Sequence, residues 1–393
     1  MHIVYVTWHF VQSENEVLEG GIDNYLYKIS KYMQKKGHSV TIVAAGKKEC
    51  RWQYEGVPVY TVEIPFRKYL EHYQWSKYLF PIFREIAFNK ALRIINREKS
   101  ITIVQYAAGF GTGLLYNKKL PAVLRVSTYT RIENKGTKVG LEYKIPVLYE
   151  KMAARRFSNI FTPSKSCGRI LAKEIRKKVY VIHTPYEIEA GLVEDDSIYC
   201  KDLYRKKYFL YFGRLHPIKG TETIARCIYD ILERNPEHLI CFAGPMDNSI
   251  ATRQWRLMKK SAGVYKERVI YVGNLKHTQL YPIIRHAECI LMPSNYDNLP
   301  NACLEALILN GIVIGTKRAS FEEIYKDGES GYLIELDNSA QLLQKIDTVV
   351  SMSASEKEAM REKARSVLKN FTFDKLGGKL ERYYENVIRE WQR

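Results

Sequence analysis

The chain has 393 residues, of which 46% are hydrophobic and 26% are charged, and it carries a formal net charge of +18. This composition is typical of a folded globular protein, and the length predicts two domains of about 200 residues each. No run approaches the roughly 18 apolar residues of a spanning helix, and none of the seven cysteines forms a CxxC pair. These features argue against a membrane-spanning protein, a disulfide framework and a zinc site, and they fit the reducing cytoplasm.

Short β-branched or aromatic runs alternate with longer amphipathic segments from the N-terminus onward, a pattern typical of βαβ units. The opening stretch MHIVYVTWHF lacks a basic lead and a small-residue cleavage site. It is therefore predicted to form a first strand and not a signal peptide. A helix is predicted over residues 24–38, ended by Gly37. The strands predicted in the first half are residues 2–8, 39–46, 58–64, 101–107, 122–128, 159–164 and 179–185.

The second half repeats this alternation. Its predicted strands are residues 208–215, 238–245, 268–275, 288–294 and 311–316. The tail, residues 373–393, is predicted to form a terminal helix after a Gly377-Gly378 break and to cross back to the first domain. The fold class is therefore α/β, with two Rossmann-like doubly wound domains facing across a cleft. The predicted boundaries are residues 1–190 for the first domain, 191–207 for a polar linker and 208–372 for the second domain.

The positive charge is concentrated in the first half. Residues 1–190 hold 31 Lys and Arg against 16 Asp and Glu, a net +15, whereas residues 191–393 hold 30 against 27, a net +3. A first half with this excess of positive charge is expected to attract an anionic phospholipid surface, a pyrophosphate-linked lipid or nucleic acid. Residues 66–99 interleave aromatic with basic side chains and are predicted to lie on an anionic bilayer, or else to pack as a helix with a solvated basic face. The basic residues expected to face lipid are Arg67, Lys68, Lys77 and Arg84.

The turn GRLHPIKG directly follows a predicted strand of the second half. Arg214 and Lys219 flank its Pro217. Because open α/β sheets bind ligands at the carboxyl ends of their strands, both cations are expected at a ligand site. A guanidinium and an ammonium there suit a diphosphate, although two solvated basic residues would give the same pattern.

The stretch SNYDNLPNACLEAL places Asp297 before a predicted helix and Glu305 inside it, with seven residues between them. The free N–H groups at the start of that helix, entered through Pro300, form an anion site. A bend at Asn298-Leu299 would bring both carboxylates towards the same ligand, where they could accept hydrogen bonds from sugar hydroxyls. The alternative is a helix-start aspartate with an exposed glutamate.

Two weaker features complete the set. Gly20-Gly21 opens the first predicted helix and would allow a ligand close to the backbone, but the pattern is not GxGxxG. His9 and His183 lie near strand ends, where a lone histidine is more often a structural residue. No Asp-x-Asp turn and no His/Cys cluster is present, so no metal is expected.

Taken in order, these motifs resemble those of retaining nucleotide-sugar glycosyltransferases of family 4, which have the GT-B fold. The matching stretches are Gly20-Gly21, FGRLHPIKG, AGP at 243–245, VGNL at 272–275, PSNYDNLPNACLEAL and ASFEEIYKDGESGYLIE. The family pattern of Glu, seven residues, Glu becomes Asp297 and Glu305 here.

The resemblance implies a role for each matching residue. Arg214 and Lys219 would hold the donor diphosphate, Glu305 the ribose and Asp297 the transferred sugar. These four are the expected catalytic residues. The remaining donor-binding residues would be Gly20, Gly21, Asn274, Leu275, Asn298, Leu299 and Pro300. Many relatives carry a histidine where this chain has Ser127, so Ser127 and Arg125 are candidates on the acceptor side.

The implied function is metal-independent, retaining transfer from a nucleoside diphosphate sugar, with UDP expected, to a saccharide or lipid-linked acceptor. The first domain would bind the acceptor and the second the donor, in bacterial surface polysaccharide or glycolipid assembly. The enzyme would be cytoplasmic, at the inner face of the membrane. No cofactor and no nucleic acid is expected. Two alternatives remain: another GT-B enzyme, such as an epimerase or phosphorylase, or a membrane- or nucleic-acid-binding protein with an inactive site.

Overall fold

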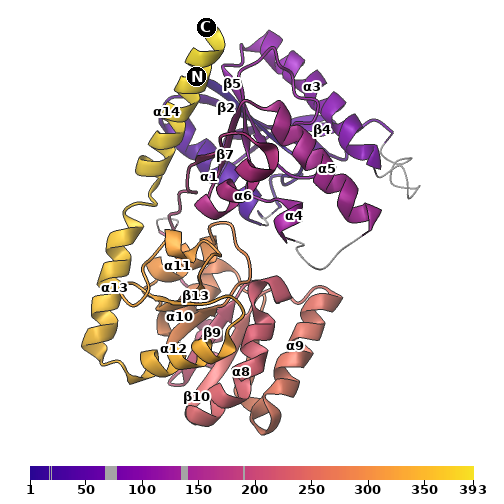
Figure 1. Ribbon diagram of the computed structural model, residues 1–393. Coiled ribbons are helices and arrows are strands. Elements are labelled where there is room, and N and C mark those ends of the chain that lie inside the picture. The colour runs from indigo at the N-terminus through magenta and orange to yellow at the C-terminus, as the bar shows by residue number, and fades with distance from the viewer. Residues whose placement is uncertain (17, 19, 67–77, 134–139, 189–190) are drawn as a thin grey trace. The chain divides into compact units, whose positions relative to one another are not determined.

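The computed structural model describes residues 1–393 apart from residues 17, 19, 67–77, 134–139 and 189–190 (Figure 1). The chain forms two compact units. The first unit comprises Met1–Pro185 and Phe373–Arg393, and the second unit comprises Tyr186–Thr372. Each unit is built on a largely or wholly parallel sheet with helices, which confirms the predicted α/β class with two Rossmann-like domains.

Among its described residues, the first unit has a sheet of eight strands in the order β3-β4-β2-β1-β5-β6-β7-β8. Neighbouring strands are parallel except for the antiparallel pair β3 and β4. The strands are β1 His2–Thr7, β2 Ser39–Gly46, β3 Cys50–Tyr54, β4 Val57–Glu63, β5 Ile103–Ala107, β6 Ala122–Arg125, β7 Asn159–Thr162 and β8 Tyr180–Val181. Because β2 and β5 flank β1 on its two sides, the order of the sheet reverses between β1 and β5.

The sequence pattern missed β3. This strand lies at the edge of the sheet, and most of its side chains are exposed, so CRWQY has no apolar alternation to reveal it. The helices in the described part of this unit are α1 Gly21–Lys35, α3 Phe80–Glu98, α4 Thr130–Glu133, α5 Leu141–Arg156, α6 Lys165–Ile175 and α14 Phe373–Gln392.

The predicted break in the terminal helix is wrong, because α14 continues through both glycines. A Cβ atom at Gly377 would lie 2.5 Å from the Tyr32 ring of α1, so the glycine is needed for close packing of the two helices. Further along α14, the Tyr384 hydroxyl donates a 2.5 Å hydrogen bond to Gln105 Oε1 in β5. These contacts place the C-terminal helix in the first unit (Figure 1).

The sheet of the second unit has six parallel strands in the order β11-β10-β9-β12-β13-β14, so its order reverses between β9 and β12. The strands are β9 Lys207–Phe212, β10 His238–Ala243, β11 Val269–Gly273, β12 Cys289–Met292, β13 Val313–Thr316 and β14 Tyr332–Ile334. The α-helices are α7 Ser197–Asp202, α8 Thr221–Arg234, α9 Ser249–Ser261, α10 His277–His286, α11 Asn301–Ile308, α12 Ser339–Ser351 and α13 Ala354–Leu368. Short 3-10 helices lie at Pro217–Lys219, Gly263–Arg268 and Phe321–Glu323.

The core of the second unit shows why these segments fold as they do. Helix α8 buries Ile224, Ile228, Ile231 and Leu232 completely, at the spacing that places all four on one helical face. They pack in one cluster with buried side chains of β9, β10 and β13. The predicted linker, residues 191–207, contains helix α7 and therefore has structure of its own.

Arg84, expected to face lipid, is buried in α3 with 2% of its surface exposed. Its Nη2 donates a 2.8 Å hydrogen bond to the carbonyl of Phe110, so its charge cannot meet a bilayer. That expectation is wrong for Arg84, while Arg67, Lys68 and Lys77 lie outside the described residues. Within the described ranges, no helix is long and apolar enough to cross a membrane.

Candidate functional site

The two motifs of the second half meet at the carboxyl edge of the second unit's sheet. Strands β9 and β12 are neighbours, so the loops that follow them leave the same edge where the strand order reverses. The backbone N–H of Asn295 donates a 2.8 Å hydrogen bond to the carbonyl of Ile218, which joins the loops directly. Ligands of open α/β sheets bind at such a reversal point.

Gly220 makes this close approach possible. Its φ is 76°, and a Cβ atom there would lie 1.8 Å from the carbonyl oxygen of Pro293. No other residue type combines this left-handed backbone with so little space. The glycine thus fixes the distance between the loop that carries Lys219 and the loop that carries Asp297.

The turn after β9 is held by its own side chains. The Tyr211 hydroxyl donates a 2.7 Å hydrogen bond to the carbonyl of Arg214. His216 Nδ1 accepts a 3.2 Å hydrogen bond from the backbone N–H of Ile218 and so caps the short helix that ends at Lys219. Burial and the positive charges of Arg214 and Lys219 lower the pKa of His216, which keeps its ring neutral and able to accept. The Arg214 side chain is exposed.

Lys219 and Asp297 contact each other. From the sequence, Lys219 was expected to bind the diphosphate of the donor and Asp297 the transferred sugar. Lys219 Nζ lies 2.6 Å from Asp297 Oδ2, with the side chains 36% and 16% exposed. Asp297 Oδ1 also accepts a 3.0 Å hydrogen bond from the backbone N–H of Asn298, and its carbonyl accepts one of 3.1 Å from Ser320 Oγ. The pair therefore has a fixed position at the edge of the sheet.

The chain bends sharply between Asp297 and α11. Leu299 is 3% exposed and has a φ of 59°, which is uncommon for a leucine. After the bend, Pro300 occupies the N-cap position of α11, and no side chain of the described residues caps this helix. The N–H groups of its first turn and the helix dipole can therefore face an anion.

Glu305 is buried within α11, with 8% of its side chain exposed. His277 Nε2 of α10 lies 3.7 Å from Glu305 Oε1. Burial and the Glu305 carboxylate raise the pKa of Tyr186 well above its ordinary value. A buried carboxylate among a tyrosine, a histidine and helix α11 is a suitable acceptor for ligand hydroxyls.

Asn274 and Leu275 directly follow β11, at the far edge strand of the same sheet. Asn274 is exposed and Leu275 half-buried. Two backbone hydrogen bonds link the end of β11, where this loop begins, to the centre of the sheet. The N–H of Gly244 donates to the carbonyl of Gly273, and the N–H of Gly213 donates to the carbonyl of Ala243, each at 2.9 Å. Glu305 lies within α11, and the other donor-binding candidates of the second half lie in the loops and short turns that follow the strands at the carboxyl edge.

The candidates of the first half are placed differently. Gly20 and Gly21 are exposed where α1 begins, and Gly20 has a φ of 87°. Ser127 is half-buried just beyond β6. Arg125 is 3% exposed, lies 3.6 Å from the centre of the Tyr25 ring, and donates a 2.9 Å hydrogen bond to Thr184 Oγ1. Its guanidinium is thus packed inside the first unit and does not lie at the surface.

His9, expected to be a structural residue, lies against a buried carboxylate of α1. His9 Nδ1 lies 2.9 Å from Asp23 Oδ2 at the start of α1. Sequence could have indicated this pair only through Asp23, which lies two residues after Gly21. Among the residues described, no group of three or more His, Cys, Asp or Glu side chains could hold a metal ion.

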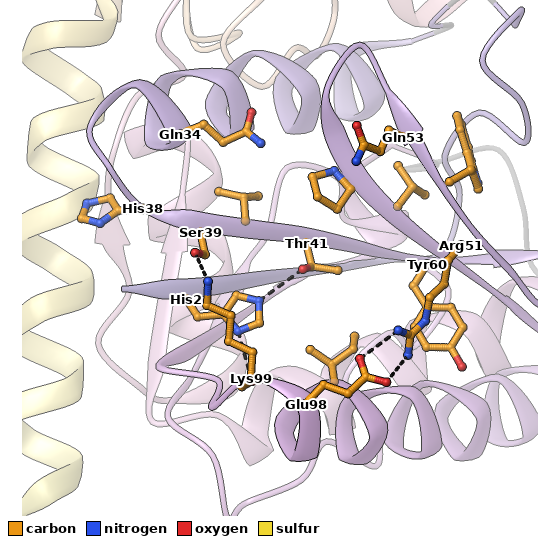
Figure 2. A pocket seen from close by; sticks show the side chains of 15 residues that line it. His2, Gln34, His38, Ser39, Thr41, Arg51, Gln53, Tyr60, Glu98 and Lys99 are labelled. Atoms are coloured by element: carbon orange, nitrogen blue, oxygen red, sulfur yellow. Dashed lines mark hydrogen bonds and ion pairs between the residues drawn. The ribbon is translucent and has the colours of Figure 1, made fainter.

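A cavity of about 630 Å³ lies in the first unit at the amino ends of β1 and β2 (Figure 2). Its polar groups are largely bonded to one another. Arg51 forms two 2.8 Å hydrogen bonds with Glu98, and the ring nitrogens of His2 lie 3.2 Å from the Lys99 carbonyl and from Thr41 Oγ1. Because it lies at the opposite edge from the loops that follow the strands, we do not assign it to the candidate site.

Two family models match the chain, one in each half. A family model described as glycosyltransferase family 4 matches residues 19–190, and one described as glycosyl transferases group 1 matches residues 202–367. An uncharacterized glycosyltransferase of Methanocaldococcus jannaschii is 21% identical over 98% of both chains. Spore coat protein SA of Bacillus subtilis is 23% identical over 47% of this chain, and the match spans 50% of that relative.

Solved structures cover nearly the whole chain. Sucrose-phosphate synthase from Thermosynechococcus elongatus superposes with a TM-score of 0.78 at 13% identity, covering 99% of each chain. Anabaena HepE in complex with UDP and glucose superposes with a TM-score of 0.68 at 14% identity, covering 98% of this chain and 100% of HepE. Two Rossmann-like units with this likeness define the GT-B fold, and the two family models indicate a glycosyltransferase. Within that class the chain is similar to family 4.

Proposed function

We propose that the protein transfers a sugar from a nucleoside diphosphate sugar to a saccharide or lipid-linked acceptor, with retention of configuration and without a metal. The observation that carries this proposal is the Lys219–Asp297 pair, 2.6 Å apart, at the reversal point of the second unit's sheet. UDP is the proposed nucleotide, because HepE was solved with UDP and glucose.

The charges of the second unit fit the departure of a diphosphate. When the bond between the anomeric carbon and the diphosphate oxygen breaks, negative charge grows on the diphosphate. Arg214, Lys219 and the N-terminus of α11 supply positive charge that is already in position, so little reorganisation is needed. Retention by same-face attack, without a protein nucleophile, is proposed from the family resemblance.

The first unit is proposed to bind the acceptor. The net +15 of residues 1–190 would favour an anionic acceptor or an anionic membrane surface. We therefore propose a peripheral position at the inner face of the cell membrane, in the assembly of a bacterial surface polysaccharide or glycolipid. Arg84 has no part in this attraction, because it is buried.

The two carboxylates are expected to act on different parts of the donor. Glu305→Gln should weaken binding of free UDP by about tenfold or more, because a carboxylate makes stronger hydrogen bonds to ribose hydroxyls than an amide does. Asp297→Asn should leave free UDP unaffected and weaken binding of the intact UDP-sugar. Calorimetric titration of both variants with both ligands measures this division.

Glu237→Gln is the matched control, because Glu237 is an exposed carboxylate just before β10, at the opposite edge of the same sheet. It should bind both ligands as the wild type does. Equal loss of free UDP in the Glu305 and Asp297 variants would contradict the proposed roles.

A further inference from the structure

Helix α9 and the turn after it carry all of the excess positive charge of the second half. Residues 249–268 hold six Lys and Arg against one Glu, a net +5, whereas residues 191–393 as a whole have a net +3. The remainder of the second half therefore has a net charge of −2. Helix α9 lies beside α8 on the outside of the second unit (Figure 1).

Three of these cations share one face of α9. Arg253, Arg256 and Lys260 are spaced by three and four positions, so they lie in a row along the helix, and all three are exposed. None of them forms an ion pair with a carboxylate that the structure describes, whereas Arg234 of the neighbouring α8 pairs with Asp347 at 2.7 Å. Like charges at these spacings destabilise a helix. This row, the basic face of α9, is therefore unfavourable for the helix itself and suits an anionic partner.

Other cations hold the turn that follows α9 in place. Lys259 Nζ donates a 2.6 Å hydrogen bond to the carbonyl of Lys266. Arg268 Nη1 donates one of 2.9 Å to the carbonyl of Asn235, and its Nη2 donates one of 2.6 Å to that of Leu232. The turn lies at the amino edge of the sheet, because α9 leads from the carboxyl end of β10 to the amino end of the parallel strand β11. It is therefore a fixed structure at the edge opposite to the donor loops.

The turn presents apolar groups directly beside the basic face. Val264 is 79% exposed, which no contact with the core explains. The ring of Tyr265 packs against that of Tyr229, with centroids 5.1 Å apart, and Tyr229 is 38% exposed. Lys260 precedes these groups in the chain and the exposed Lys266 follows them. Tyrosines next to cations and an exposed aliphatic side chain are typical of surfaces that meet a bilayer at the level of its headgroups.

We propose that the basic face of α9, together with Val264, Tyr229 and Tyr265, docks the second unit on an anionic phospholipid bilayer. The cations lie against lipid phosphates, and Val264 enters the headgroup region. The exposed Val264 favours a bilayer over nucleic acid, since an aliphatic side chain gains nothing from a polyanion in water. The inference goes beyond the proposed function, which places the lipid contact in the first unit, and it does not depend on sugar transfer.

Cosedimentation of the full-length protein with vesicles tests this surface. The vesicles are phosphatidylcholine with phosphatidylglycerol, or phosphatidylcholine alone. The wild type should pellet only with the first kind. The triple variant Arg253→Gln, Arg256→Gln, Lys260→Gln should partition about a hundredfold more weakly, because each basic residue at an anionic surface strengthens binding about fivefold. A wild type that ignores lipid charge, or a triple variant that pellets as the wild type does, would overturn the proposal.

The matched control removes the same charge elsewhere in the second unit. Lys201→Gln, Lys363→Gln, Lys369→Gln replaces three exposed lysines outside α9 and its turn. It should bind vesicles as the wild type does, and equal losses in the two triple variants would mean that total charge decides and not α9. Urea unfolding checks the fold. The α9 variant should be no less stable than the wild type, because its substitutions remove like-charge repulsion.

A fluorophore at position 264 reports on the apolar part of the surface. Cys50 and Cys200, the exposed cysteines, are first replaced by serine, and Val264→Cys is then labelled with a polarity-sensitive dye. A blue shift of emission is expected with the anionic vesicles and not with the neutral ones. An unshifted emission, or tighter binding of the wild type to polyuridylate than to vesicles, would overturn the bilayer as the partner. Binding of UDP-sugars should be unchanged in the α9 variant, so a failure of the proposed function is seen separately.

Discussion

Replacing Lys219 with alanine is expected to lower turnover by about two orders of magnitude, the loss typical of removing one preorganised charge-stabilising donor. Lys219 is the cation that the fold holds most firmly at the reversal point of the second unit, 2.6 Å from Asp297. Its removal takes positive charge from the departing diphosphate and also leaves Asp297, 16% exposed, without its cation. The measurement is the rate of nucleoside diphosphate release with saturating donor and acceptor.

Lys207→Ala provides the matched control. Lys207 is the first residue of β9, at the end of the strand opposite to the turn that carries Lys219. It forms an ion pair with Glu237, and both side chains are well exposed. Its removal should leave turnover unchanged, because surface ion pairs contribute little to stability. If Lys219→Ala turns over at the wild-type rate, Lys219 does not stabilise the leaving group.

Gly220→Ala is expected to destabilise the second unit by more than about 3 kcal/mol, in the range that marks a severe local defect. An alanine in the left-handed conformation costs about 1–2 kcal/mol by itself. The larger part comes from the collision, because the new Cβ atom would lie 1.8 Å from the backbone oxygen of Pro293. Backbone cannot yield as a flexible side chain does, so the loops that carry Lys219 and Asp297 must separate. The free energy of unfolding in urea measures the effect.

Gly328→Ala separates the two contributions. Gly328 lies in the same unit with a φ of 74°, but its Cβ position has no atom within 4 Å. Gly328→Ala should therefore lower the free energy of unfolding only by the cost of the left-handed conformation, about 1–2 kcal/mol. Equal losses in the two variants would show that the contact with Pro293 does not hold the loops together.

The sequence predicted the fold well where side chains alternate or are uniformly apolar. The buried run at β9, of which Tyr208 to Phe212 are all buried, could only be a central strand. The pattern failed at β3, where exposed edge positions carry no apolar signal, and at Gly377, where the helix continues because Tyr32 fills the space beside it. In both places tertiary packing, which a single sequence does not display, decided the outcome.

The candidate site of the second unit could be proposed from sequence because most of its residues lie in short turns after strands. The contact between Lys219 and Asp297 could not be predicted, since 78 positions separate them and only the β9–β12 neighbourhood brings them together. The same reasoning applies to the partner of His9. Its partner Asp23 lies 14 positions away, and the fold of the loop decides whether the two meet.

Calorimetric titration of the wild-type protein with a panel of UDP-, GDP- and ADP-sugars tests the central claim most directly. We expect saturable binding of one UDP-sugar per chain, displaced by free UDP, weakened in Lys219→Ala and unchanged in Lys207→Ala. Failure of every nucleotide sugar in the panel to bind would contradict the assignment of the second unit as the donor site.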